Sequence, residues 1–420
     1  MNSSLTVNVD TVLHRAGLLD GRVVDVHIAA GHIVTVTETG KPLPSGATIH
    51  DLDHRLLLPA MAEPHAHLDK ALIAATTRNE TGDLFGAIDA MGRALDAGRF
   101  AHDNLVERAT AAVEMLIGHG VTAVRSHVNV GEGIGARFVA AIAEVRTAFR
   151  DLIDVEIVSL THTPLTGSDG AGNRTALAEA LSAGADVVGG CPHLDTNGIG
   201  FIETALAAAT EAGVGLDLHM DETLDPGVLT LRDLARMVTE SGFAHSVAAS
   251  HCVSLAMQTR EVQHSTAISV AAARIAVIAL PQTNLYLQGR DHSVAIPRAL
   301  TPIDLLRSEG VLVAAGGDNV QDPFNPIGRG DPLETAALLV LAGHQQPEAA
   351  YAMVSNDARE VMGLRRVEIR PGDPADLVAL RAASEREAIA TATSDRIVFH
   401  AGRLVASSTS QTTIHHTRGV

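Results

Sequence analysis

The sequence predicts an α/β protein in which a (β/α)8 TIM barrel is joined to a small β-sandwich domain built from both termini. Three observations support this fold class. The chain has 420 residues, more than a single compact core usually holds. Its middle alternates short apolar runs with alanine-rich helical stretches. Its two ends share a different texture of short, alternating segments.

The two ends of the chain alternate apolar and polar residues, a pattern typical of short strands. In residues 1–55, pieces such as RVVDVHIA and HIVTVT are separated by turn residues. The same texture returns at 371–380 and 396–406. We therefore expect antiparallel strands from 1–57 and 365–420 to form one composite β-sandwich, and the barrel to occupy 58–364.

Eight apolar runs in the middle of the chain are candidates for the barrel strands. Each is followed by a helix-like stretch, such as GFIETALAAATEAG after the fourth run. A doubly wound open sheet is the structural alternative, but no GxGxxG motif follows the first strand to support a dinucleotide-binding fold. The runs lie at 57–62, 121–128, 153–160, 185–190, 214–219, 246–251, 276–280 and 311–318.

The composition excludes several classes of partner. A formal net charge of -18, from 49 acidic and 31 basic residues, argues against binding to nucleic acid. The sequence contains neither an apolar run of about 18 residues nor a secretory signal, which argues against a membrane protein. Two cysteines cannot form a disulfide framework in a chain of this length. We expect a cytoplasmic homo-oligomer that acts on a small molecule.

The most informative motif is the His-x-His pair that ends the run LLLPAMAEPHAH at 56–67. Side chains alternate faces along a strand, so His65 and His67 point the same way and can share a metal ion. Two solvated surface histidines are an equally good interpretation of the pair alone. Later strand ends favour the metal site, because the active site of such a barrel gathers at the C-terminal ends of its strands. These ends carry His127, His162, His193, His219, His251 and Asp318.

Four of these residues form a plausible ligand set. Imidazole nitrogens and a carboxylate oxygen suit Zn²⁺, Fe²⁺ or Mn²⁺, and an open coordination position would admit water. Such an ion lowers the pKa of bound water to about 7, so hydrolysis is the natural chemistry. The candidate ligands are His65, His67, His219 and Asp318.

Four carboxyl and imidazole groups are candidates to move protons at this site. Glu222 lies three residues beyond His219 and could transfer a proton from the attacking water to a leaving group. A solvated loop glutamate is the alternative, and Asp221 competes for the role. His251 could contact the metal-bound water or act as a fifth ligand, and Asp318 could serve as both ligand and proton acceptor.

Six motifs in order along the chain resemble the amidohydrolase superfamily, and within it the cytosine deaminase branch that includes the isopropylammelide amidohydrolases. The resemblance spans nearly the whole chain. The motifs are EPHAHLDK (63–70), VRSHV (124–128), HMDE (219–222), ASH (249–251), NLYLQGR (284–290) and GDNVQDPFNPIG (317–328).

The resemblance implies a single catalytic metal, Glu222 as the proton shuttle and His251 as the residue that orients water. It assigns the metal ligands to His65, His67, His219 and Asp318. Binuclear members commonly bridge two metals through a carbamylated lysine on the fourth barrel strand. The lysines of this chain are Lys41 and Lys70, so one metal is favoured over two.

The pocket motifs depart from those of cytosine deaminases. His162 stands where they have a glutamine that reads the pyrimidine edge, Asn319 stands where a second aspartate is usual, and Phe324 stands where tryptophan is common. Cytosine is therefore disfavoured as the substrate. We expect Lys70 and Gln288 to line the pocket as well. Three further residues are assigned supporting or packing roles: His127, His193 and Arg290.

The leading hypothesis is hydrolytic deamination of a cyclic amidine, such as an aminopyrimidine, an aminotriazine or a related N-heterocycle. Metal-bound hydroxide would attack the ring carbon and release ammonia or an amine. One alternative is a hydantoinase-like hydrolase that opens a cyclic amide, which the missing bridging lysine disfavours. Another is an inactive scaffold, which should have lost metal ligands, whereas every expected ligand is present.

Overall fold

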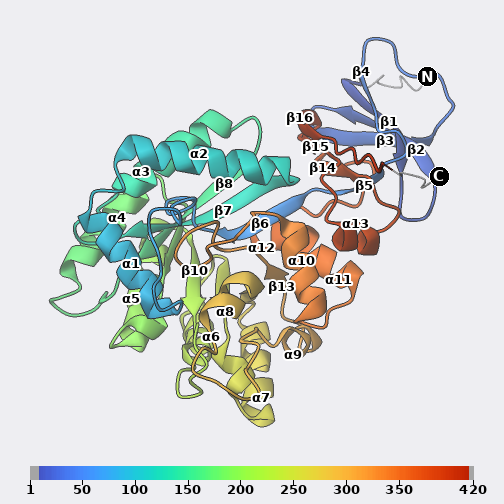
Figure 1. The fold of residues 1–420 in the computed structure, drawn as a ribbon. Helices are drawn as coiled ribbons and strands as arrows, with labels where there is room; N and C mark the ends of the chain where they lie inside the picture. Colours follow the sequence, from blue (N-terminus) through green and yellow to red (C-terminus); the bar gives the residue numbers. More distant parts are fainter. Residues whose placement is uncertain (1–8, 416–420) are drawn as a thin grey trace. The chain divides into compact units, whose positions relative to one another are not determined.

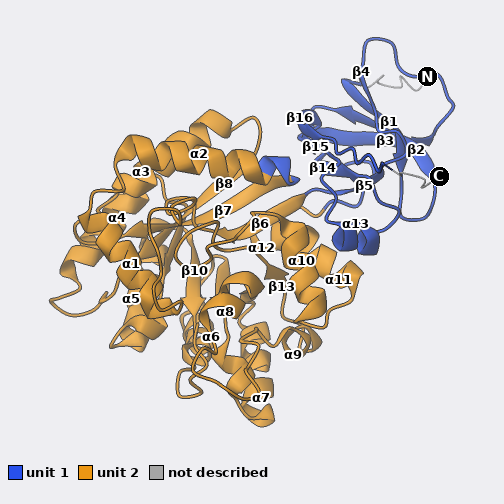
Figure 2. Cartoon of the chain, in the orientation of Figure 1, with its two compact units in different colours: residues 1–60, 117–120, 367–420 blue, residues 61–116, 121–366 orange. Residues whose placement is uncertain are grey.

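The computed structural model describes residues 9–415 and divides them into two compact units. One unit combines the chain up to Ala60, residues 117–120 and the chain from Val367 onward. The other comprises 61–116 and 121–366 (Figure 2). Among residues 9–415, no helix combines the length and apolar character that a bilayer span needs.

The terminal unit is built around one mixed sheet with strand order β16-β15-β14-β5-β1-β2-β3, and β4 pairs with β1. The prediction of a small β unit made from both ends of the chain is confirmed. Its strands are β1 (Thr11–Gly17), β2 (Val23–Ala29), β3 (His32–Glu38), β4 (Thr48–Asp51), β5 (Leu56–Pro59), β14 (Leu377–Leu380), β15 (Arg396–His400) and β16 (Arg403–Ser408).

The sequence pattern predicted antiparallel strands in this unit, but the observed pairing is mixed. Strand β1 runs antiparallel to β2 but parallel to β4 and β5. Strand β5 in turn runs antiparallel to β14. Alternation predicts which face of a strand is buried but carries no information on the direction of its neighbour. Leu13, Val26 and Phe399 belong to the buried core of this unit, and Ser384 caps the short helix α13 (Glu385–Thr391).

The apolar run at 56–62 is divided between two sheets, so the expected first barrel strand was placed too early. Residues Leu56–Pro59 pair with β14 in the terminal sheet. After Ala60 the chain enters β6 (Met61–Ala66), which runs parallel to β7 in the barrel. His65 therefore lies within the first barrel strand, and His67 lies just beyond its end.

The second unit is the predicted barrel, with eight parallel strands in sequential order (Figure 1). The first and last strands meet where the backbone N–H of Asp318 donates to the carbonyl oxygen of His65 (3.0 Å). The strands are β6, β7 (Val121–Val130), β8 (Asp154–Thr161), β9 (Val187–Gly190), β10 (Gly215–Met220), β11 (Val247–His251), β12 (Ala276–Ala279) and β13 (Val313–Ala315).

Helices follow the strands and surround the barrel (Figure 1). They are α1 (Leu84–Asp96), α2 (His102–Gly118), α3 (Arg137–Phe149), α4 (Ala171–Ser182), η1 (Pro192–Leu194), α5 (Gly198–Ala212), α6 (Thr230–Ser241), η2 (Ser254–Met257), α7 (Arg260–Ala272), α8 (Pro281–Leu287), α9 (Ile303–Ser308), α10 (Pro332–Leu341), α11 (Pro347–Met353) and α12 (Asn356–Val361).

Candidate metal centre and catalytic pocket

The candidate ligands come together at the C-terminal ends of the barrel strands. His65 and His219 lie on β6 and β10, and Asp318 follows β13. Asp318 and His251 both adopt left-handed backbone conformations, with φ of 64° and 69°. Non-glycine residues with such angles cluster at functional sites, where the surrounding structure holds the strained backbone.

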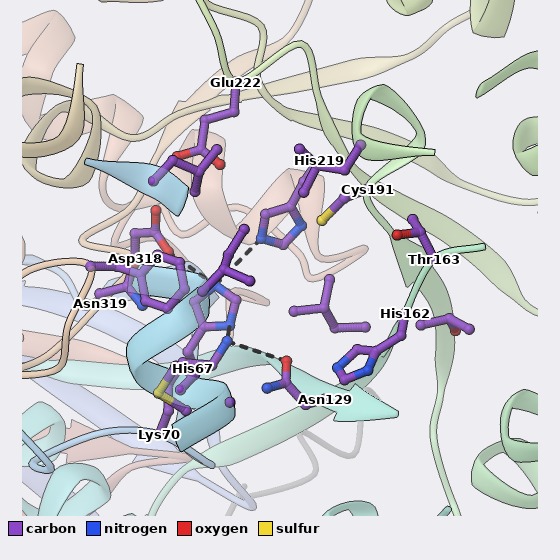
Figure 3. Close-up of a pocket in the computed structure, with 18 of the residues that line it drawn as sticks. His67, Lys70, Asn129, His162, Thr163, Cys191, His219, Glu222, Asp318 and Asn319 are labelled. Carbon is purple, nitrogen blue, oxygen red and sulfur yellow. Dashed lines mark hydrogen bonds and ion pairs between the residues drawn. The ribbon is translucent and has the colours of Figure 1, made fainter. Parts of the chain in front are cut away.

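Three imidazole nitrogens and one carboxylate oxygen converge on a single point (Figure 3 shows His67, His219 and Asp318). His219 Nε2 lies 3.2 Å from His65 Nε2 and 3.4 Å from His67 Nε2. Asp318 Oδ1 lies 3.1 Å from His67 Nε2 and 3.6 Å from His65 Nε2. Ligands bound to zinc at 2.0–2.1 Å in a tetrahedron are about 3.3 Å apart. The four groups therefore have the spacing of a metal site.

The hydrogen bonds of His65 and His67 leave their Nε2 lone pairs facing this point. His67 Nδ1 donates to the carbonyl oxygen of His127 (3.0 Å). The Ser250 hydroxyl donates to Asp217 Oδ1 (3.2 Å), so it accepts from His65 Nδ1 (2.8 Å). A neutral imidazole that donates through Nδ1 has an unprotonated Nε2.

The electrostatics of this cluster also fit a cation. Burial and the neighbouring histidines lower the pKa of His65 and His219 well below its usual value, and burial lowers that of His67 in the same way. All three rings are therefore neutral and able to coordinate at neutral pH. Among the described residues, neither carboxylate oxygen of Asp318 has a hydrogen-bond partner. A divalent ion would satisfy these oxygens and the converging lone pairs together.

A network of hydrogen bonds links His65, through Ser250, to Asp217 and Arg125. Asp217, which accepts from Ser250, also accepts from Arg125 Nη1 (2.8 Å). Arg125 Nε donates to Glu156 (2.5 Å), so both ends of its guanidinium are paired. The His127 ring stacks on His65 with centroids 3.9 Å apart. Groups that hold a metal ligand in one orientation and one tautomer strengthen metal binding.

Glu222 presents a buried carboxyl group to the cavity. Its Oε1 lies 3.7 Å from His251 Nδ1 and has no hydrogen-bond partner among the described residues. Burial, helped by the negative charge of Asp318, raises the pKa of Glu222 well above its usual value. A carboxyl group with a raised pKa can hold a proton and also release it, which suits general acid and base chemistry.

His251 has one ring nitrogen fixed and the other open. Its Nδ1 donates to Asn284 Oδ1 (3.0 Å), and its Nε2 lies 4.0 Å from Asp318 Oδ2. Burial lowers the pKa of His251 to about 4, so the ring is neutral. The Nε2 lone pair is therefore available to accept a hydrogen bond from water beside Asp318.

A cavity of about 350 Å³ opens beside this cluster. Four of the residues expected in the pocket line it: Lys70, His162, Asn319 and Phe324. Lys70 Nζ lies 5.3 Å from the centre of the Phe324 ring and 3.3 Å from Asn129 Oδ1.

The remaining expected residues have other surroundings. Gln288 is not among the lining residues, and its amide donates to the backbone carbonyl of Glu222 (2.9 Å). His193 Nδ1 donates to the carbonyl oxygen of His219 (3.2 Å). Arg290 lies over the Tyr286 ring and donates to its carbonyl oxygen (2.6 Å). Each of these three side chains donates a hydrogen bond to a backbone carbonyl oxygen.

Sequence reasoning missed several residues of the pocket. Asn129 lines it and lies two residues beyond His127, so the two-residue period of a strand could have found it. Cys191 follows β9 and lines the same cavity, where burial raises the pKa of its thiol to about 12 and keeps it protonated. Helix α1 contributes Leu84, Ile88, Met91 and Leu95, which recur at helical spacing.

Comparisons with known proteins find relatives over most of the chain. A family profile described as "Amidohydrolase family" matches residues 95–406. A pterin deaminase from Rhizobium rhizogenes is 31% identical over 388 residues, covering 91% of this chain and 87% of the relative. An N-isopropylammelide isopropyl amidohydrolase from Pseudomonas sp. is 24% identical over 371 residues, covering 84% and 87%.

The solved structures show the same fold. A 5-methylcytosine deaminase from Klebsiella pneumoniae, liganded with phosphonocytosine, superposes with a TM-score of 0.85 at 24% identity. The match covers 96% of this chain and 100% of that one.

Proposed function

The chain belongs to the amidohydrolase family, and from this premise we propose that it hydrolyses the bond between a ring carbon and an amino group in an N-heterocycle, releasing ammonia. The observation that carries the proposal is the convergence of three imidazole nitrogens and Asp318 beside a cavity that also exposes the Glu222 carboxyl group. The pterin deaminase relative supports deamination over other hydrolytic reactions.

One divalent metal ion would be held by His65, His67, His219 and Asp318. When bound, an ion such as Zn²⁺ or Fe²⁺, with Mn²⁺ as a further candidate, supplies a coordinated water of lowered pKa and a positive charge for the developing oxyanion. A single ion is favoured because the fourth barrel strand, Val187–Gly190, offers no lysine to bridge a second.

Glu222 moves the protons of the reaction. As a carboxylate it takes a proton from the attacking water and gives it to the ring nitrogen beside the carbon under attack. The oxygen of the water forms the new bond to that carbon. The second proton of the water then passes through Glu222 to the amino group, which leaves as ammonia when the C–N bond breaks. The product carries a carbonyl group where the substrate carried the amino group.

His251 and the cavity wall orient the reactants. The open Nε2 of His251 accepts a hydrogen bond from the attacking water and so directs its lone pair at the ring. Asn319, Asn129 and His162 offer donors and acceptors to the polar edges of a heterocycle. Phe324, with Lys70 beside its ring, offers a flat apolar surface for the face of the heterocycle.

Among heterocycles, we place bicyclic aminopyrimidines of the pterin type first. The pterin deaminase is the relative with the higher identity of the two sequences compared above. A cavity of about 350 Å³ has the volume of roughly a dozen waters, more than one small ring fills.

Ammonia release from a panel of rings tests the proposal. Metal-loaded protein is incubated with pterin, cytosine, an aminotriazine and a cyclic amide, and both ammonia and the organic product are measured. We expect ammonia and the oxo product from an amino-substituted ring. A ring-opened acid without ammonia would support the cyclic-amide hydrolase instead, and no turnover of any compound by metal-loaded protein would overturn the proposal.

A further inference from the structure

Helix α1 has three faces of different chemistry. Ala87, Ala90 and Ala94 are buried. Asp89 and Arg93 pair with each other on the exposed face. Between these two faces runs a stripe of larger apolar residues at helical spacing: Leu84, Ile88, Met91 and Leu95.

All four residues of this apolar stripe line the catalytic cavity. Ile88 is 41% exposed, so the stripe reaches solvent at the cavity. Phe85, nearby on the same helix, is 71% exposed outside the cavity lining. Exposed apolar patches of this kind mark binding surfaces in soluble proteins. Because the stripe is continuous with the cavity that holds Glu222 and Asp318, its natural occupant is part of the same substrate.

Two phenylalanines extend the apolar wall. Phe100 and Phe138 both line the cavity, and their ring centroids lie 5.3 Å apart. Arg108 lies over the first ring and Arg137 over the second, so both rings are held in place. Ile134, in the turn before α3, completes this wall, which therefore consists of apolar side chains from α1, Phe100, Ile134 and Phe138.

Gly92 leaves a notch in the wall. It lies four residues after Ile88 in the middle of α1 and lines the cavity. A Cβ atom placed on it would meet no other described atom within 4 Å. Glycine is among the least favourable residues in a helix interior, and no steric conflict with the described structure requires it here. The space in front of Gly92 is thus open to a ligand.

We propose that the apolar stripe of α1, with the notch at Gly92 and the rings of Phe100 and Phe138, binds an uncharged apolar substituent of the substrate ring, such as an aryl or branched alkyl arm. This inference rests on the proposed function, because the polar residues of the cavity are assigned to the heterocycle. The polar side chains Lys70, Asn129 and His162 come from the strand ends, whereas the wall offers an arm only apolar contacts. A charged arm would lose its hydration there without a partner.

The test compares two substrates in three proteins. The substrates are unsubstituted pterin and a pterin with a phenyl arm on the ring, remote from the amino group. The proteins are wild type, Gly92→Leu, which fills the notch, and Asp96→Leu, which places the same side chain on an exposed position of α1. Thermal unfolding confirms that each variant is folded. The measured quantity is the ratio of kcat/KM for the two substrates.

We expect wild type and Asp96→Leu to prefer the phenyl-bearing ring by about tenfold or more, and Gly92→Leu to lose most of that preference. No preference in wild type, or an unchanged preference in Gly92→Leu, would overturn the inference. One further outcome would overturn the inference. If Gly92→Leu sediments differently from wild type while its ratio of kcat/KM values is unchanged, the stripe contacts a second copy of the chain.

Failure of the proposed function gives a separate result. If neither ring yields ammonia, the same two compounds are titrated calorimetrically into wild type and Gly92→Leu. Tighter binding of the phenyl-bearing ring to wild type, lost in Gly92→Leu, would support the subsite although deamination had failed. Equal affinities in both proteins would overturn it.

Discussion

Asp221 and Glu222 are neighbours in the chain, but their carboxyl groups have opposite surroundings. The Asp221 carboxylate accepts from the backbone N–H groups of Thr230 (2.9 Å) and Leu231 (3.0 Å) and so holds the start of α6. The Glu222 carboxyl group faces the cavity, where its Oε1 lies 3.7 Å from His251 Nδ1. Of the two candidates, only Glu222 has a carboxyl group free to exchange protons with a substrate.

The first prediction concerns this pair. Glu222→Gln keeps the shape of the side chain but cannot carry a proton between water and ring, so kcat should fall by about 100-fold or more with metal content unchanged. Asp221→Asn is the matched control. It loses part of the α6 cap and should lower the free energy of unfolding by about 1 kcal/mol while the folded enzyme keeps most of its kcat. Full activity in Glu222→Gln would refute the proton-transfer role.

The second prediction concerns metal content. His65→Ala and Asp318→Ala each remove one of the four converging ligand atoms and should reduce the bound metal per subunit several-fold after dialysis. His102→Ala is the control, because this histidine is exposed and pairs with Glu144 on the surface. Elemental analysis of the purified proteins measures the effect, and full metal content in both ligand variants would contradict the assigned site.

The third prediction concerns the hydroxyl behind His65. Ser250→Ala removes the acceptor that fixes the His65 tautomer and should weaken metal binding by about 10- to 100-fold. Ser159→Ala is a fair comparison, since that hydroxyl is also buried in the barrel but donates to the backbone of Val187 (3.2 Å). Competition with a chelator gives both affinities. Equal losses in the two variants would indicate a general effect of losing a buried hydroxyl.

The fourth prediction concerns the stability of the metal-free protein. Burial lowers the pKa of His65, His67 and His219 below its unfolded value, so the unfolded chain binds more protons in acid. These three histidines therefore lower the free energy of unfolding when the pH drops below about 6.5, where the unfolded chain becomes protonated. At higher pH they have no such effect.

Burial raises the pKa of Glu63 to about 8 and also raises the pKa of Glu222 and Asp318, so these carboxyl groups change the free energy of unfolding in the opposite direction. The share of the three histidines, followed by urea unfolding, is a loss of stability between pH 7 and pH 5.

This loss should be smaller in His219→Asn, where one of the three titrating rings is absent. An equal pH dependence in the variant and the wild type would show that other groups cause it.

The barrel could be predicted because its signals are local. Each strand is a short apolar run followed by a helical stretch, and these runs recur eight times. The start of the first strand was misplaced because residues 56–62 are uniformly apolar, and the division at Ala60 depends on pairing with β14, far along the chain. The parallel pairing of β1 with β4 and β5 likewise depends on contacts that alternation does not encode.

Residues of the candidate site could be predicted where the residue type itself suggests metal binding or catalysis. Histidines and an aspartate at strand ends pointed to four side chains that the geometry brings together, those of His65, His67, His219 and Asp318. Ser250 was missed because a serine acquires its role only from the side chains that surround it in space. Gln288 carries a polar group suited to a pocket, but the fold directs that group to the carbonyl oxygen of Glu222.

The reaction itself is tested most directly by following the fate of water. Metal-loaded protein is incubated with pterin in ¹⁸O-labelled water, and the product mass and the ammonia are measured together. Hydrolytic deamination predicts one ¹⁸O atom in the oxo product and one ammonia per substrate consumed, with both signals lost in Glu222→Gln. Consumption of substrate without ammonia, or an oxo product that lacks the label, would contradict the account.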